Sequence, residues 1–205
     1  MKHKYDNYEN CYKAVENRGL NIQYVPDEFL DSKLLSAAVD NNPWAINYIK
    51  DKQNNPIIDK DICIKAVCRN ALLIAYIPER FKTDDIHLEA VKAHGMSLKF
   101  IEDKYKTIPI CIEAIKNNVT AIHYIPNELK NEGFYKEILK DNPTAIKYID
   151  KDHRSDDICL IAILSYYNNN NDISLEDTIK KFDSYIPNGC SNSLINNLKE
   201  KYILN

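Results

Sequence analysis

The sequence predicts an all-α solenoid of about seven two-helix units, or repeats, with a C-terminal helical cap. Three observations support this prediction. A block of about 24 residues recurs along the chain, its apolar residues have helical spacing, and the 205 residues include only four glycines. So few glycines disfavour a β-rich fold with many tight turns, and the apolar spacing does not alternate as it would in strands.

The repeat is most visible at an aromatic residue followed by Ile or Val. The sequence Tyr-Ile/Val-Pro begins at Tyr24, Tyr76, Tyr124 and Tyr185. The aromatic positions 24, 48, 76, 100, 124 and 148 are separated by 24, 28, 24, 24 and 24 residues. The single longer interval indicates a four-residue insertion near residues 54–59.

Several other positions recur in register with the aromatic residue. A small or apolar residue, usually Ala, lies ten residues before it, an aliphatic residue follows, and Ile or Leu lies two residues before it. These positions predict the core of the repeats: Ala14, Val15, Ile22, Tyr24, Ala38, Val39, Ile46, Tyr48, Cys63, Ala66, Val67, Ile74, Tyr76, Ala90, Val91, Leu98, Phe100, Cys111, Ala114, Ile115, Ile122, Tyr124, Ile146, Tyr148, Cys159 and Ala162.

Alternate repeats differ in two columns. Odd repeats carry Cys three residues before the Ala column, and most of them carry Pro after the aromatic pair, whereas even repeats carry neither. The building block is therefore predicted to be a pair of repeats, 48 residues long.

Each repeat is expected to contain two helices of about two to three turns. In the repeat over 61–81, Asp59 or Asp61 is expected to cap the first helix, and Ser32, Asp84 and Asp156 hold similar places elsewhere. That helix is expected to end near Asn70. The Asn recurs at 42, 118 and 142, as a C-cap or as the N-cap of a second helix. The prolines at 26, 78 and 126 cannot continue that second helix.

The chain divides by pattern into a repeat array over 1–165 and a degenerate last repeat with a cap over 166–205, within one continuous domain. The Asn run at 168–171 is expected to be a loop. Helices are expected from Ser174 to about Tyr185 and from Ser191 or Ser193 to Leu204, separated by Asn188-Gly189. An array of short helices buries its apolar faces on neighbouring repeats, so a terminal cap is expected.

The columns Cys-x-x-Ala-Val, then Asn, then Ile-x-Tyr-Ile-Pro resemble the DUF4116 repeat family. The resemblance covers about residues 10–165 and implies tandem helical units with a domain of about two of them. It implies no catalytic residues. Members of the family occur in giant viruses, amoeba-associated bacteria and protists. Even repeats here lack the Pro, and the tail after Ile163 departs from the pattern.

Composition limits the function classes. The net charge of -3 disfavours a general nucleic-acid binder, and no stretch reaches the ~18 apolar residues needed to span a bilayer. The N-terminal residues are polar and lack the apolar core of a signal peptide. We therefore expect no membrane association and a cytoplasmic location, which would be the host cytoplasm for a viral or bacterial protein.

The residues that could carry chemistry are better explained by packing. Cys11, Cys63, Cys111 and Cys159 occupy equivalent positions in separate repeats, too far apart for disulfides, and no Cys-x-x-Cys suggests zinc. Neither a metal nor a cofactor is expected. Among the histidines, we expect His87 to be packed, His94 to cap a helix end and His123 to face solvent. His153 lies in the acidic and basic segment 150–157, most simply an inter-repeat loop.

Trp44 is the only tryptophan, and its column otherwise holds Leu20, Leu72, Met96, Thr120 and Thr144. Packing is its simplest role, but an exposed Trp44 would be the best candidate for contacting a partner. The leading hypothesis is a non-enzymatic scaffold for an unidentified protein partner, with its oligomeric state open. The alternatives are an enzyme with a site in the C-terminal region or in segment 150–157, and an RNA-binding repeat protein.

Overall fold

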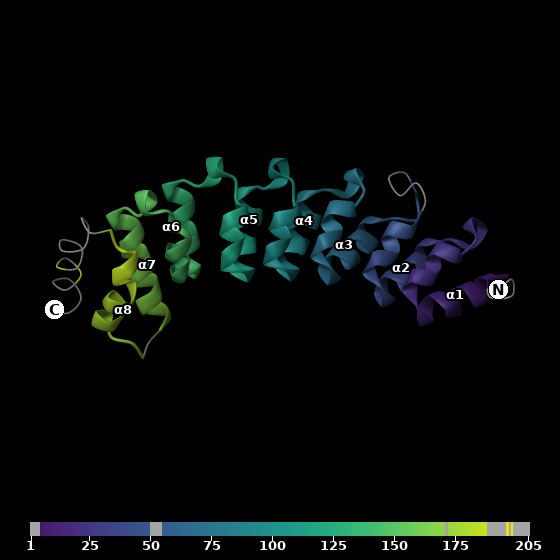
Figure 1. The fold of residues 1–205 in the computed structure, drawn as a ribbon, viewed down its shortest axis with the longest axis horizontal. Helices are drawn as coiled ribbons and strands as arrows, with labels where there is room; N and C mark the ends of the chain where they lie inside the picture. The colour runs from purple at the N-terminus through teal and green to yellow at the C-terminus, as the bar shows by residue number, and fades with distance from the viewer. Residues whose placement is uncertain (1–4, 50–54, 171, 188–195, 197, 199–205) are drawn as a thin grey trace. The chain divides into compact units, whose positions relative to one another are not determined.

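The computed structural model describes residues 5–49, 55–170, 172–187, 196 and 198 (Figure 1). All regular structure in the described residues is helical, which confirms the all-α prediction. Ten-residue α-helices begin six successive repeats and a longer and a shorter helix follow: α1 (Tyr8–Asn17), α2 (Ser32–Asn41), α3 (Lys60–Arg69), α4 (Asp84–Ala93), α5 (Ile108–Asn117), α6 (Glu132–Asp141), α7 (Asp156–Asn169) and α8 (Leu175–Phe182).

The second helix of each repeat is a six-residue 3₁₀-helix, a tighter form than the sequence had indicated. These helices are η2 (Gly19–Tyr24), η4 (Pro43–Tyr48), η5 (Ala71–Tyr76), η7 (Gly95–Phe100), η9 (Val119–Tyr124) and η11 (Pro143–Tyr148). A third, three-residue 3₁₀-helix that was not predicted follows most of them: η3 (Asp27–Phe29), η6 (Glu79–Phe81), η8 (Asp103–Tyr105), η10 (Asn127–Leu129) and η12 (Lys151–His153). After α8 the chain forms η13 (Asp183–Tyr185).

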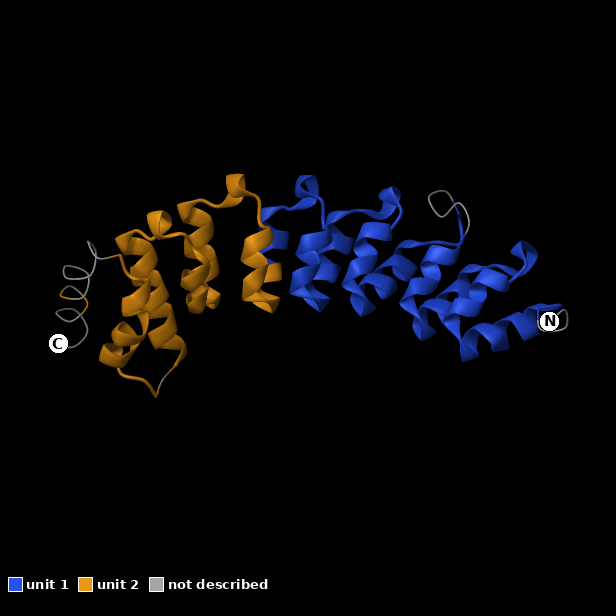
Figure 2. Cartoon of the chain, in the orientation of Figure 1, with its two compact units in different colours: residues 1–113 blue, residues 114–205 orange. Residues whose placement is uncertain are grey.

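The described chain separates into two compact units, Met1–Glu113 and Ala114–Asn205, with the boundary inside α5 (Figure 2). In unit 1, α1 to α4 pack in chain order, and η2 lies against η4, η4 against η5 and η5 against η7. In unit 2, α6 packs on α7, α7 packs on α8, and η9 lies against η11. Each unit is therefore a row of helical repeats joined to their sequence neighbours.

The Asn column performs both capping roles that the sequence left open. The backbone N–H of Asn70 donates to Ala66 O at 3.0 Å and ends α3, while its side-chain oxygen accepts from Leu72 N at 3.1 Å and starts η5. One residue thus satisfies polar groups at the end of one helix and the start of the next. Asn42 and Asn118 do the same.

The N-caps of the α-helices lie one residue earlier than several of the predicted positions. Asp59 caps α3 as expected, accepting from Ile62 N at 2.8 Å. Asp31 and Ser155, rather than Ser32 and Asp156, accept the equivalent bonds, and Thr83 rather than Asp84 holds the N-cap position of α4. The cap must have extended backbone, which places it just outside the acidic first turn.

The Ala and aliphatic columns form the core as predicted. Ala38, Ala66, Ala90, Ala114 and Ala162 are fully buried, as are the aliphatic residues that follow Ala38, Ala66 and Ala90. A small side chain lets the α-helix and the 3₁₀-helix of a repeat approach closely. In unit 1 the approach between repeats is also close, because a Cβ on Gly19 would lie 2.3 Å from Ala38 O.

The C-terminal region follows the prediction in part. The helix expected at 174–185 is present as α8 and η13. The Asn run is not all loop, because α7 continues through Asn169. The predicted division after residue 165 falls inside α7 and stays a prediction. The helix expected up to Leu204 and the Asn188-Gly189 break lie largely or wholly outside the described residues.

Candidate functional site

The aromatic residues of the first three repeats in unit 1 are exposed, which corrects their assignment to the core. Tyr24 is 60%, Tyr48 44% and Tyr76 47% exposed. Ile22 and Val25, which are three residues apart and so share a face in 3₁₀ geometry, point inward in the first repeat. The residue three before each Tyr is also buried (Asn21, Ala45 and Leu73), so the exposure of the Tyr goes with its place as the last residue of the helix and not with the 3₁₀ period alone. Phe100, Tyr124 and Tyr148 are half-buried rather than core residues.

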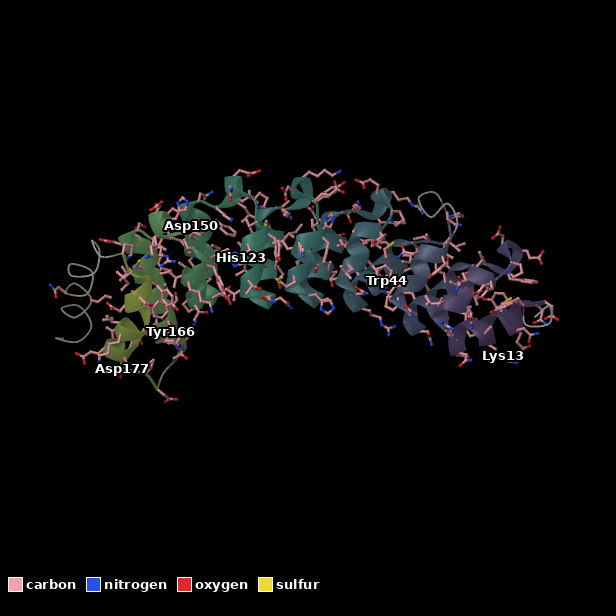
Figure 3. All side chains as sticks on the ribbon, viewed as in Figure 1. Lys13, Trp44, His123, Asp150, Tyr166 and Asp177 are labelled. Atoms are coloured by element: carbon pink, nitrogen blue, oxygen red, sulfur yellow. The ribbon has the colours of Figure 1, made fainter. Side chains whose placement is uncertain are left out.

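Trp44 lies near the start of η4, four residues before Tyr48 (Figure 3). It is half-buried, and its ring meets Tyr76 of the next repeat edge to face, with ring centroids 5.6 Å apart and an interplanar angle of 63°. Trp44 therefore packs between repeats and adds aromatic area beside an exposed Tyr, and its contact with a partner stays a prediction.

We define the aromatic row as Tyr24, Trp44, Tyr48, Leu72 and Tyr76. Leu72 is 42% exposed and occupies the same column as Trp44. The three helices that carry the row, η2, η4 and η5, contain no Asp, Glu, Lys or Arg. Because these helices lie side by side in unit 1, their outward residues form an uncharged surface spanning three repeats. Tyr and Trp are the side chains most often found at the centre of protein interfaces.

A second feature of unit 1 is an ionic cluster at the ends of two repeats. Lys82 lies 3.0 Å from both Glu79 and Glu102, and Lys104 lies 3.3 Å from Glu79 and 3.1 Å from Glu102. The Tyr105 hydroxyl also donates to Glu79. These bonds, first that from Tyr105, lower the pKa of Glu79 to about 2. The cluster joins the third and fourth repeats.

His87 lies behind this cluster, with its ring centroid 4.8 Å from that of Tyr105. It is 1% exposed, as the packing prediction expected, and its Nδ1 has no hydrogen-bond partner among the described residues. Burial lowers the pKa of His87, so the ring is neutral near pH 7. His87, Lys82, Glu102 and Tyr105 line a cavity of about 110 Å³, large enough for a few water molecules.

The segment 150–157 in unit 2 is organised around Arg154. Arg154 is 9% exposed, and its guanidinium donates to Ile149 O at 2.8 Å and to Tyr185 O at 3.0 Å. This side chain links η13 to segment 150–157. The sequence alone did not predict this structural role. His153 is exposed beside Tyr135, at the edge of a cavity of about 210 Å³.

The remaining histidines lie close to their predicted positions. His94 occupies the C-cap of α4, where its backbone N–H donates to Ala90 O, and its Nε2 lies 3.1 Å from Cys68 O. His123 lies in η9 (Figure 3) and is exposed. Its ring centroid lies 5.2 Å from that of Tyr148 in η11.

The thiols of the Cys column are buried in the described structure. Cys11, Cys63, Cys111 and Cys159 have no measurable exposure, and all are free thiols. Burial raises the pKa of Cys63 to about 12 and that of Cys111 to about 11, so both remain protonated near neutral pH. A protonated, buried thiol is a poor nucleophile and a poor metal ligand. Cys190 lies outside the described residues.

The described residues can also be compared with the requirements of a metal site and of a membrane-spanning helix. No group of three or more His, Cys, Asp or Glu side chains in them is arranged to hold a metal ion. None of the helices in the described ranges has the length and apolar character to cross a membrane.

The sequence pattern did not predict the exposed aromatic row or the unpartnered nitrogen of His87. A polar residue in the Cys/Leu/Tyr column was a usable signal for His87. The three-residue interval between Ile22 and Val25 and its equivalents was a usable signal for the 3₁₀-helices but not for the exposure of the Tyr residues.

Comparison with known proteins identifies the repeat. No curated protein and no solved structure matches the chain. The family described as "Domain of unknown function (DUF4116)" matches residues 7–52, 59–106, 85–130 and 107–154. Each match spans two successive repeats, as the predicted pair does, and the overlapping match over 85–130 begins on an even repeat. These matches cover most of the chain, which therefore belongs to the DUF4116 family.

Proposed function

We propose that this protein is a helical-repeat scaffold that binds a partner protein through the aromatic row of unit 1. The observation that carries the proposal is the exposure of Tyr24, Tyr48, Leu72 and Tyr76 on 3₁₀-helices that contain no charged residue. Exposed apolar residues that cluster in this way mark interaction surfaces more often than scattered ones do.

The chemistry of the row favours a protein partner over a nucleic acid. Binding to a phosphate backbone depends on Lys and Arg that neutralise phosphates. The helices of the row offer none, whereas aromatic rings with a single hydroxyl or N–H are suited to contacts with protein surfaces. We also propose that the protein has no enzymatic activity and acts in the cytoplasm. For a viral or bacterial protein, this would be the cytoplasm of the host.

The test is capture of partners from a lysate of the native source or its host, with quantification by mass spectrometry. The row variant Tyr24→Ser/Tyr48→Ser/Tyr76→Ser is compared with wild type. Ile108→Ser is the matched control, because Ile108 is 43% exposed in unit 1 but lies outside the row. We expect specific partners to be lost only with the row variant. Partners retained by a folded row variant would contradict the proposal.

A further inference from the structure

The ring pair of His87 and Tyr105 recurs two repeats later with the residue types exchanged. In the fourth repeat, His87 of α4 lies against Tyr105 at the end of η8, with ring centroids 4.8 Å apart. In the sixth repeat, 48 residues further along, Tyr135 of α6 lies against His153 at the end of η12, with centroids 5.6 Å apart. The buried ring of the pair is therefore His in one repeat and Tyr in the other.

This exchange decides which of the two His rings must be charged inside the protein. His153 is exposed, so water solvates its charged form without any change of structure. His87 is 1% exposed, and its Nδ1 has no hydrogen-bond partner among the described residues. Both nitrogens of a charged ring are donors. A buried charge with an unsatisfied donor is strongly disfavoured, so a charged His87 favours a conformation in which water reaches the ring.

The charged groups that act on His87 do not supply a free counter-ion. Asp84, Glu79 and Glu102 favour the charged ring, and Lys82 opposes it, but burial has the largest influence. Glu79 and Glu102 each already pair with Lys82 at 3.0 Å. An ion pair between His87 and either carboxylate would therefore disturb the ionic cluster that joins the third and fourth repeats.

Other elements packed against α4 carry charged side chains that have partners elsewhere. These are Lys60, Lys65 and Arg69 of α3, with Asp85, Asp40 and Val39 O, and Lys99 of η7, with the Phe100 ring. Helix η5 contains no Asp, Glu, Lys or Arg. The response of this site to protonation is therefore expected to follow the ring pair and its ionic cluster.

The cavity beside His87 shows where the structure would have to open. Ile74 and Ala75 of η5 and Tyr105 at the end of η8 line it, and its volume is about 110 Å³. The Tyr105 hydroxyl also donates to Glu79 of η6. Because the Tyr105 ring lies against His87, hydration of a charged His87 requires this ring to move. That movement would break the contact between η6 of the third repeat and η8 of the fourth.

From these observations we propose that protonation of His87 locally opens the junction between the third and fourth repeats, by releasing η8 from η6, and that the exchanged ring pair of the sixth repeat gives no such response. This inference goes beyond the proposed function and does not depend on it.

The direction of the response follows from proton linkage. Burial lowers the pKa of His87 in the closed form, so the open form binds the proton more tightly and gains population as the pH falls below about 6.5. The carboxylates of the cluster do not produce this change, because the pKa of Glu79 is lowered to about 2 and that of Glu102 is also lowered.

The test is hydrogen–deuterium exchange of the full chain, followed by mass spectrometry at about pH 7.5 and about pH 5.5 and corrected for the intrinsic exchange rate at each pH. The backbone N–H groups of Tyr105, Lys106 and Thr107 donate hydrogen bonds at the junction and report its opening. Their protection should fall by about three- to tenfold at the lower pH. About tenfold is the limit, because an exposed His is about tenfold more often charged than neutral at pH 5.5.

The sixth repeat supplies an internal control that needs no variant. The backbone N–H groups of His153 and Arg154 donate the equivalent hydrogen bonds, and their protection should change less than about twofold. Unchanged protection at 105–107, or an equal fall in both segments, would overturn the inference. This comparison within the wild-type chain decides the question even where a variant does not fold.

Two variants of the fourth repeat assign the response to the ring pair. His87→Leu introduces the residue type of Leu35, its equivalent in the second repeat, and His87→Tyr/Tyr105→His copies the sixth repeat. Both should abolish the loss of protection at 105–107. Circular dichroism at about pH 7.5 establishes that each variant is folded. A response that persists in either folded variant would overturn the inference.

The reverse exchange tests whether the ring pair is sufficient. Tyr135→His/His153→Tyr places a buried His in α6 and should create a loss of protection of about threefold or more at 153–154. A folded variant without this new response would overturn the assignment to the ring pair.

Discussion

The 3₁₀-helices η4 and η5 of unit 1 and η11 of unit 2 share a backbone but expose different chemistry. In unit 1 the last Tyr of η4 and of η5 is 44% and 47% exposed, and the residues before it are Asn47 and Ala75. In unit 2 Tyr148 is half-buried, with the Lys147 ammonium 4.8 Å from its ring centroid and the His123 ring at 5.2 Å. The residue at the inward position is Ile in all three of these helices (Ile46, Ile74 and Ile146).

This difference shows that one repeat can change its surface without changing its core. The outward positions tolerate Ala, Asn, Lys or His because these side chains reach solvent, whereas the inward Ile must fill a closely packed space. Variation at the residue before the aromatic ring is therefore expected to change the exposure of that ring.

The largest expected effect tests the shared core. Ile46 of η4 and Ile122 of η9 are 0% and 2% exposed at equivalent positions. Ile46→Ala and Ile122→Ala should each lower the free energy of unfolding by about 2–5 kcal/mol, because each leaves a cavity. Urea unfolding followed by circular dichroism measures this change. Tyr48→Ala serves as the exposed control, with an expected change within about 1 kcal/mol. A small loss of stability at only one of the two Ile positions would show that the two units do not share the same core.

The second prediction gives unit 1 the surface of unit 2. Asn47→Lys and Ala75→Lys place Lys where Lys147 lies in unit 2. The double variant should weaken partner binding by about tenfold, or about 1.4 kcal/mol, because the added ammonium groups cover the Tyr rings and must be desolvated. Affinity is measured with the captured partner. Lys147→Ala, the reverse change in unit 2, should leave that affinity unchanged, and an equal loss there would contradict the assignment to unit 1.

The third prediction concerns His87, which has Leu35 as its equivalent in the second repeat. Burial lowers the pKa of His87 in the folded protein, so below about pH 6.5 the unfolded chain binds a proton that the folded chain does not. Stability should therefore fall as the pH drops through this range. His87→Leu should remove this contribution and stabilise the protein by about 1 kcal/mol near pH 7, because the unpartnered Nδ1 is gone.

The measurement for His87 is urea unfolding at several pH values between 5 and 8. Asp84, Glu79 and Glu102 favour the charged ring and Lys82 opposes it, but all are weaker influences than burial. His123→Gln is the control, since His123 is exposed. A pH dependence that survives in His87→Leu would assign the effect to other groups.

The smallest expected effect compares two members of the Asn column within unit 2. The Asn118 side chain accepts from Thr120 N at 3.0 Å, whereas Asn142 makes no side-chain capping bond. Asn118→Ala should cost about 1 kcal/mol, and Asn142→Ala should cost less. Thermal unfolding of both variants measures the difference. Equal losses of stability in the two variants would mean that the capping bond is not the reason for Asn at these positions.

Much of the fold could be predicted from residue patterns, because the periodic positions face the same environment in every repeat. The Ala, Val and Ile columns, the Asn caps and the helix at 174–185 are present as expected. The core assignment of Tyr24, Tyr48 and Tyr76 was wrong, because recurrence shows that a residue has a constant place and does not show whether that place faces inward.

The candidate site was less predictable for the same reason. Trp44 could be selected by its type, but its contact with Tyr76 depends on how η4 lies against η5. The surroundings of His87 in α4 include the Tyr105 ring at the end of η8, and this contact depends on how the two helices are placed.

The sequence by itself determined the repeat length, the order of helices and the apolar columns that must be buried, since these follow from local periodicity and capping. Only the tertiary structure decided that the second helix is 3₁₀ and that an aromatic row in unit 1 faces solvent. The physical reason is that burial of its Ile brings one side of each six-residue helix close to the core. That approach leaves the Tyr side chains outside the core.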